Sequence, residues 1–152
     1  MSKYAEIESL ALEIICTENS THNKMQMLCD LLDQKLNHFN WTGFYRADNE
    51  SRLLHLEVYT GEPTDHTTIP FGKGICGQAA DIEQTFVIDD VSAESNYISC
   101  NINVKSEIVV PIIRDGIVLG QIDIDSNTAA AFKQEDQDLL ENICKALAPY
   151  II

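Results

Sequence analysis

The segment from Lys105 to Asp125 limits the fold of this chain more than any other, because it has the pattern of a tight β-hairpin. Two runs rich in isoleucine and valine flank the dipeptide Asp115-Gly116, which favours a two-residue hairpin turn. A hairpin joins antiparallel strands, whereas parallel strands need a long crossover connection between them. The segment therefore predicts a sheet that is antiparallel at this point.

Other segments predict the elements around this hairpin. Three have apolar residues at the three-and-four spacing of an amphipathic helix: 4–16, 21–38 and 134–148. A second hairpin is predicted from two β-rich runs joined by a short polar turn: 40–48 and 52–59. The remaining segments predict a glycine-rich turn into a helix at 71–84, a short strand at 85–89, and loops at 61–70 and 90–104. This order predicts an α+β fold, with a central antiparallel sheet flanked by helices in one domain over residues 1–152.

Composition excludes several classes of function. The 152 residues carry a net charge of −14, whereas nucleic acids and anionic membranes bind clusters of Lys and Arg. No apolar run is long enough to span a membrane, and the first ten residues lack the apolar core of a secretory signal. Five cysteines without regular spacing predict a reducing, cytoplasmic location. No Cys-x-x-Cys or His-x-x-x-His pair occurs, so neither a metal site nor a cofactor is expected.

Two of the five cysteines are candidates for a reactive thiol. Cys100 lies in a predicted polar loop, seven residues before Glu107, where a thiol can be accessible and close to acidic groups. Cys76 is expected near the N-terminus of a helix, a position that lowers the pKa of a thiol; a buried structural role is the alternative. The other three lie on or beside apolar faces and are expected to be buried: Cys16, Cys29 and Cys144.

The second strand of the strong hairpin carries two aspartates on one face. Asp123 and Asp125 alternate with isoleucines, which places the two carboxylates about 7 Å apart on the same side of the strand. One interpretation is a solvated outer face. The other is a site for a cation, because like charges on one face repel and a ligand ammonium between them would remove that repulsion. Glu107, on the neighbouring strand, could join this acidic group.

Aromatic residues in the other predicted hairpin suggest a pocket for a small apolar group. Trp41, Gly43 and Tyr45 share a strand face, and the two rings lie about 13 Å apart along the strand. Gly43 has no side chain, so the rings could form two walls around a gap. Core packing of the only tryptophan in the chain is the alternative interpretation.

Taken together, these segments resemble GAF domains and, within that fold, the free methionine-(R)-sulfoxide reductases. The resemblance covers roughly residues 20 to 150. The matching segments are 40–45, 71–77, 98–100, 105–111 and 119–126.

The resemblance implies a role for each candidate residue. It identifies Cys100 as the thiol that attacks the sulfoxide sulfur, and Glu107 as the acid that protonates the departing oxygen. Aromatic walls around the sulfoxide methyl and carboxylates that hold the substrate are also implied: Trp41, Tyr45, Glu107, Asp123 and Asp125. The implied partners are free methionine-(R)-sulfoxide and a reductant, either thioredoxin or a small thiol. A homodimer is implied as well, with the first two helices as its contact.

The chain differs from the family pattern near the reactive thiols. His66 stands where family members usually carry a cysteine that takes part in the disulfide step, and Tyr97 and Asn101 replace a usual His and Asp. Cys76 is therefore the candidate resolving thiol, with direct reduction of Cys100 by a small thiol as the alternative. A non-catalytic GAF module, which binds a small molecule or senses redox state, is the alternative function.

Overall fold

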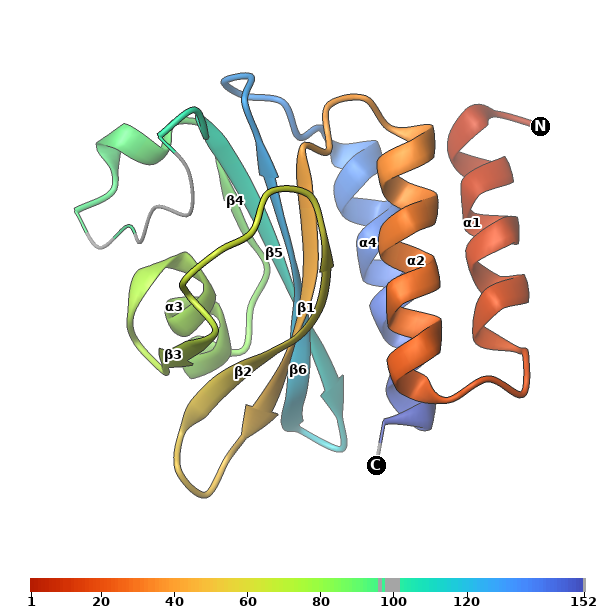
Figure 1. The fold of residues 1–152 in the computed structure, drawn as a ribbon, viewed down its shortest axis with the longest axis horizontal. Helices are drawn as coiled ribbons and strands as arrows, with labels where there is room; N and C mark the ends of the chain where they lie inside the picture. Colours follow the sequence, from red (N-terminus) through yellow and green to blue (C-terminus); the bar gives the residue numbers. More distant parts are fainter. Residues whose placement is uncertain (96, 98–101, 152) are drawn as a thin grey trace.

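The computed structural model describes residues 1–95, 97 and 102–151, which form one antiparallel sheet with helices on both faces (Figure 1). The helices are α1 (Lys3–Ile15), α2 (Thr21–Lys35), α3 (Gly74–Ile82) and α4 (Gln134–Leu147). The strands are β1 (Trp41–Asp48), β2 (Leu53–Thr60), β3 (Thr68–Pro70), β4 (Phe86–Ile88), β5 (Ser106–Arg114) and β6 (Ile117–Ser126). Two short 3-10 turns, Val91–Ala93 and Ala148–Tyr150, complete the described elements. The predicted α+β class is confirmed.

The six strands lie in the order β3-β2-β1-β6-β5-β4, which brings the two predicted hairpins together at the centre of the sheet. In the turn between β5 and β6, Asp115 and Gly116 both have positive φ, of 54° and 77°. Positive φ at both central residues matches the twist of the flanking strands and is the conformation that Asp-Gly favours. The predicted β5–β6 and β1–β2 hairpins are therefore confirmed.

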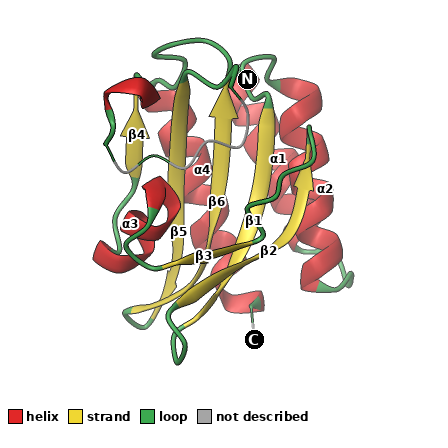
Figure 2. Ribbon diagram, turned by 60° about the vertical axis from the view of Figure 1, so that its left-hand side comes forward, coloured by secondary structure: helices red, strands yellow, loops and turns green. Residues whose placement is uncertain are grey.

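Helices α1, α2 and α4 cover one face of the sheet, and α3 lies on the other (Figures 1 and 2). The larger core lies under the three helices and contains the isoleucines that alternate with the aspartates of β6, Ile122 and Ile124. In α4 the predicted inward face is buried: Leu139, Leu140, Ile143 and Leu147. A second apolar cluster fills the space between α3 and the opposite face of the sheet. The sheet is consequently buried on both faces.

Three sequence predictions about the fold are corrected. Thr68–Pro70 was expected within a loop but forms β3, which pairs with Leu53–His55 on the edge of the sheet. The second helix ends at Lys35, because Leu36 already has extended backbone, and not at His38. Cys16 is exposed, because it lies just beyond the last turn of α1. Cys29 and Cys144 are buried, as expected.

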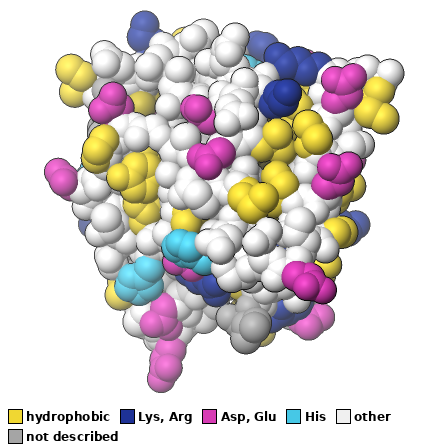
Figure 3. Space-filling view, turned by 45° about the vertical axis from the view of Figure 1, so that its right-hand side comes forward, with side chains coloured by type: hydrophobic (Ala, Val, Ile, Leu, Met, Phe, Trp, Pro, Cys, Tyr) yellow, Lys and Arg dark blue, Asp and Glu magenta, His cyan; other side chains and the backbone are white. Residues whose placement is uncertain are grey.

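Acidic side chains are scattered over the face shown in Figure 3 and do not gather into one patch. This distribution agrees with the dispersed acidity of a chain that has 24 Asp and Glu residues against 10 Lys and Arg. Within the described residues, none of the helices combines the length and the apolar character needed to cross a membrane.

Candidate active site

Three carboxylates lie on the sheet face that α3 covers. Asp125 of β6 pairs with Trp41 of β1 on one side and with Glu107 of β5 on the other. Asp123, two residues earlier, faces the same way. All three side chains are buried, with exposed fractions of 5% for Glu107, 1% for Asp123 and 2% for Asp125. The interpretation of this face as a solvated outer surface is therefore wrong, because α3 and the segment before it cover the face.

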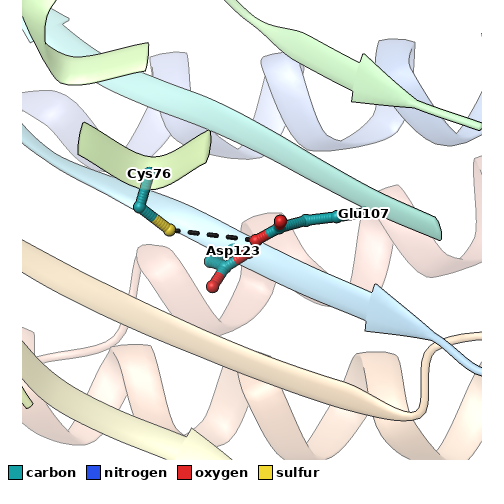
Figure 4. A group of neighbouring side chains, drawn as sticks. All are labelled: Cys76, Glu107 and Asp123. Carbon is teal, nitrogen blue, oxygen red and sulfur yellow. Dashed lines mark hydrogen bonds between the residues drawn. The ribbon is translucent and has the colours of Figure 1, made fainter. Parts of the chain in front are cut away.

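Cys76 approaches these carboxylates from α3. Its Sγ atom donates to Glu107 Oε2 over 3.9 Å, and Asp123 lies beside the pair (Figure 4). The backbone of α3 is held close to the sheet, because Gln121 Nε2 of β6 donates to the Cys76 carbonyl oxygen at 3.0 Å. Gly77 permits this close packing, since a Cβ atom there would lie 2.5 Å from the Pro70 carbonyl oxygen. Gly77 thus allows α3 to pack closely, and this packing keeps the Cys76 thiol next to the carboxylates.

Burial controls the protonation of this cluster. It raises the pKa of Asp123, and burial together with the charge of Asp123 holds the pKa of Asp125 well above its usual range. Burial, followed by the charges of Asp123 and Glu107, also raises the pKa of the Cys76 thiol well above its ordinary value. The expected lowering of that pKa by the helix N-terminus is therefore wrong, because desolvation and three nearby carboxylates outweigh the dipole.

The aromatic residues of β1 lie on the same face and hold the segment that connects β2 and β3. Trp41 donates from Nε1 to the Glu62 carbonyl oxygen at 2.9 Å, and Tyr45 donates from its hydroxyl to the His66 carbonyl oxygen at 3.0 Å. The indole stacks on Tyr59 with ring centroids 5.7 Å apart. Both aromatic side chains are thus attached to this segment.

Trp41 occupies the space that Gly43 leaves open. A Cβ atom at Gly43 would lie 2.4 Å from the indole Cη2 atom, so the ring lies directly over the glycine. The predicted gap between Trp41 and Tyr45 is thus filled by the indole itself.

Gly43→Ala is expected to displace the indole and to lower the free energy of unfolding by about 1–3 kcal/mol, as overpacking usually does. Because Trp41 is the only tryptophan, its fluorescence emission should change in the same variant. Denaturant titrations and emission spectra measure the two effects. The matched control is Gly43→Ala in a Trp41→Leu background, where the clash is relieved and the loss of stability should be smaller. Equal losses in both backgrounds would contradict this account of the glycine.

A small cavity of about 10 Å³ lies between α3 and the sheet. Its lining includes four of the predicted site residues, Tyr45, Cys76, Glu107 and Asp123, together with His66. A space of this size is at the lower limit for one water molecule. A larger ligand therefore requires the covering segment to move. A larger open groove between α4 and β5, of about 510 Å³, contains none of the predicted site residues.

The structure brings most of the predicted site together. Cys76, Glu107, Asp123 and Tyr45 share one cavity, and Asp125 and Trp41 lie beside it on the same face. Cys100, the principal candidate for the reactive thiol, lies outside the described residues, as does Asn101. Sequence reasoning assigned no role to Gln121, which is fully buried and fixes the Cys76 backbone. Its alternation with Asp123 and Asp125 was the signal that could have found it.

Comparisons with known proteins identify the family of this chain. Residues 19–151 match the family model described as GAF domain. The chain is 41% identical over 111 residues to the free methionine-R-sulfoxide reductase of Saccharomyces cerevisiae, covering 71% of this chain and 61% of that protein. It is 30% identical over 144 residues to the Escherichia coli protein of the same name, covering 95% and 86%. The structure of free methionine-R-sulfoxide reductase from Neisseria meningitidis in complex with its substrate superimposes with a TM-score of 0.92 at 33% identity, covering 97% of this chain and 87% of that one.

Proposed function

The chain belongs to the GAF-domain family of free methionine-R-sulfoxide reductases, and from that membership we propose that it reduces free methionine-(R)-sulfoxide to methionine, with Cys100 as the attacking thiol. It is an oxidoreductase with a single GAF domain as its scaffold. Four cysteines in the described part of the chain are unpaired thiols, which supports a reducing, cytoplasmic compartment.

The buried aspartates are the observation that carries the proposal. Asp123 and Asp125 each have an Oδ1 atom that is buried and accepts no hydrogen bond within the described residues. Burying a carboxylate oxygen without a hydrogen-bond donor costs free energy of folding. Such oxygens are therefore typical of sites where a bound ligand supplies the missing donor. The ammonium group of a free amino acid has the charge and the three donors that such oxygens need. This explains a preference for free methionine sulfoxide over a residue inside a peptide, which has no ammonium.

The proposed reaction transfers one oxygen atom from sulfur to sulfur. The Cys100 thiolate forms a bond to the sulfoxide sulfur while Glu107 protonates the sulfoxide oxygen. The S–O bond and the new S–S bond then break as a hydroxyl oxygen becomes bonded to the Cys100 sulfur. Methionine leaves with its sulfur reduced, and Cys100 becomes a sulfenic acid with its sulfur oxidised by the same two electrons. Trp41 and Tyr45 would enclose the sulfoxide methyl group, since both lie on the carboxylate face next to the cavity.

Regeneration of Cys100 requires a second thiol. Cys76 is the candidate within the chain, but it is 5% exposed and burial raises its pKa, so little thiolate is available to attack a sulfenic acid. His66 lines the same cavity in the place of the usual family cysteine. We therefore propose that an external small thiol reduces Cys100 directly.

The proposal predicts a dependence on the reductant. With dithiothreitol, the purified protein should form methionine from free methionine-(R)-sulfoxide and not from the (S)-epimer, as measured by amino-acid analysis. With thioredoxin the rate should be much lower, and His66→Cys should raise it, because that substitution returns a thiol to the cavity. Asp65→Cys, at the exposed neighbouring position, is the matched control and should not raise the rate. If reduced protein forms no methionine with either reductant, the enzyme assignment is wrong and the non-catalytic binding module is the better interpretation.

A further inference from the structure

Cys76, Glu107 and Asp123 have the geometry of a metal site. Each offers one ligand atom, and these atoms all lie within 4.8 Å of one another. Tetrahedral zinc with a sulfur and an oxygen ligand separates those two atoms by about 3.6 Å, given the usual bond lengths. The observed distance of 3.9 Å between Cys76 Sγ and Glu107 Oε2 is close to that value. The ligand atoms come from three different elements, α3, β5 and β6, which the fold brings together (Figure 4).

A second, independent observation points to a cation. Asp123 is 1% exposed, and its Oδ1 atom accepts no hydrogen bond from any described residue. Neither Asp123 nor Asp125 forms a salt bridge with Lys or Arg in the part of the chain that the structure describes. Lys73 lines the cavity, but its side chain is exposed to solvent. A buried carboxylate oxygen in this position would be stabilised by a bound positive ion.

The ligand set selects the class of ion. Carboxylates alone suit Mg²⁺ or Ca²⁺, but a thiolate is a poor ligand for both and a good one for Zn²⁺. Three protein ligands leave a fourth tetrahedral position for water, and the cavity of about 10 Å³ is of the size that one water requires. Neither a Cys-x-x-Cys nor a His-x-x-x-His pair is involved, which is why the sequence predicted no metal site.

We propose that Cys76, Glu107 and Asp123 bind one Zn²⁺ ion per chain. Because Glu107 and Asp123 are also the groups proposed to hold the sulfoxide, bound zinc and substrate exclude each other, so zinc acts as an inhibitor. Only this inhibition rests on the proposed function; the binding itself does not. On binding, the Cys76 thiol loses its proton to solvent and its sulfur forms the bond to zinc, so affinity rises with pH.

Cobalt(II) is the spectroscopic probe for the site. Fully reduced, metal-free protein titrated with Co²⁺ should develop a thiolate-to-cobalt charge-transfer band that saturates at one equivalent, and Zn²⁺ should abolish the band. Cys76→Ser should remove the band and weaken zinc binding by about 100-fold or more, and Asp123→Asn should weaken it by about 10- to 100-fold. Isothermal titration calorimetry measures the affinities, and circular dichroism confirms that each variant is folded. Asparagine has nearly the same shape as aspartate, so Asp123→Asn should fold even if Cys76→Ser does not. Its weaker zinc binding then tests the proposal by itself.

Two control variants separate this site from other thiols. Cys16→Ser removes the exposed thiol and Cys144→Ser a buried thiol in the other core, and neither should change the band. The proposal is overturned if no band forms, if the band persists in Cys76→Ser, or if Cys16→Ser or Cys100→Ser abolishes it. Zinc binding in a protein that forms no methionine would leave the metal site standing and remove the proposed function. Methionine formation by a protein that binds no zinc would remove the metal site and leave the proposed function standing.

Discussion

Replacing Cys100 by serine is expected to lower the rate of methionine formation from free methionine-(R)-sulfoxide by at least about 10³-fold, as loss of a catalytic nucleophile usually does. A serine hydroxyl is hardly ionised at neutral pH and does not form a sulfenic acid. The cleanest measurement is a single turnover without external reductant, in which the reduced wild-type protein should release about one methionine per chain. The variant should release none, and no sulfenic acid should be trapped on it.

Controls for this experiment use the other thiols. Cys16→Ser changes an exposed cysteine at the end of α1, on the opposite side of the sheet from the cluster, and should retain full activity. Cys76→Ser should still release one methionine per chain in the single turnover, because Cys76 is at most a resolving thiol. If Cys100→Ser keeps the wild-type rate while Cys76→Ser loses it, the two thiols have exchanged roles and the mechanism must be rewritten around Cys76.

Asp125→Asn is expected to damage activity and improve stability at the same time. The amide lacks the charge that binds an ammonium group, so kcat/KM should fall by about 10- to 100-fold, mainly through KM. The same change removes a buried carboxylate whose charge is disfavoured by burial and by the neighbouring charge of Asp123 on the same strand face. Like charges in that arrangement destabilise, so the free energy of unfolding at pH 7 should rise on the order of 1 kcal/mol and the Tm by about 2–4 °C.

The gain in stability of Asp125→Asn over wild type should depend on pH. Burial raises the pKa of Asp125 above that of the unfolded chain, so the folded chain binds more protons. The stability from this group is therefore complete below the unfolded pKa of about 3.9 and is lost as the pH rises towards the folded pKa. Asparagine does not titrate, so the gain over wild type should grow between pH 4 and 7, as followed by thermal unfolding. A gain that is constant with pH would contradict the proposed cause.

Asp136→Asn is the matched control. Asp136 is also buried, but its Oδ1 atom accepts hydrogen bonds from Tyr4 and His38, and its Oδ2 atom accepts one from the Lys133 backbone. The same chemical change there should lower the free energy of unfolding by about 1–3 kcal/mol, because an amide NH₂ replaces one of these two accepting oxygens. Two buried aspartates should thus respond to one substitution with opposite signs, and equal signs would contradict the distinction.

The sequence predicted the elements whose pattern extends over many residues. The β5–β6 hairpin could be found because two runs rich in isoleucine and valine flank an Asp-Gly turn. β3 was missed, since three residues with a terminal proline contain no periodicity and its pairing depends on β2. Cys16 was misplaced for a related reason: helical spacing does not indicate where the last turn stops packing.

In the candidate site, the sequence predicted which side chains share a strand face but not whether that face is buried. The alternation in β6 placed Asp123 and Asp125 on one face, but whether that face is dry depends on α3, which comes from a distant segment. The pKa of Cys76 could not be predicted because a helix dipole is local, whereas desolvation and carboxylate charges arise only when the chain is folded. The predicted polar loop made Cys100 a candidate, and the family resemblance supplied its role as the attacking thiol; Cys100 lies outside the described residues.

The attachment of the 61–67 segment has a kinetic consequence. Trp41 and Tyr45 hold the carbonyl groups of Glu62 and His66, and the cavity beneath admits no more than one water molecule. The rings proposed to surround the substrate are thus the ones that keep it out until both bonds break. If these residues bind the substrate as proposed, a substitution at Trp41 or Tyr45 is expected to change selectivity and association rate together.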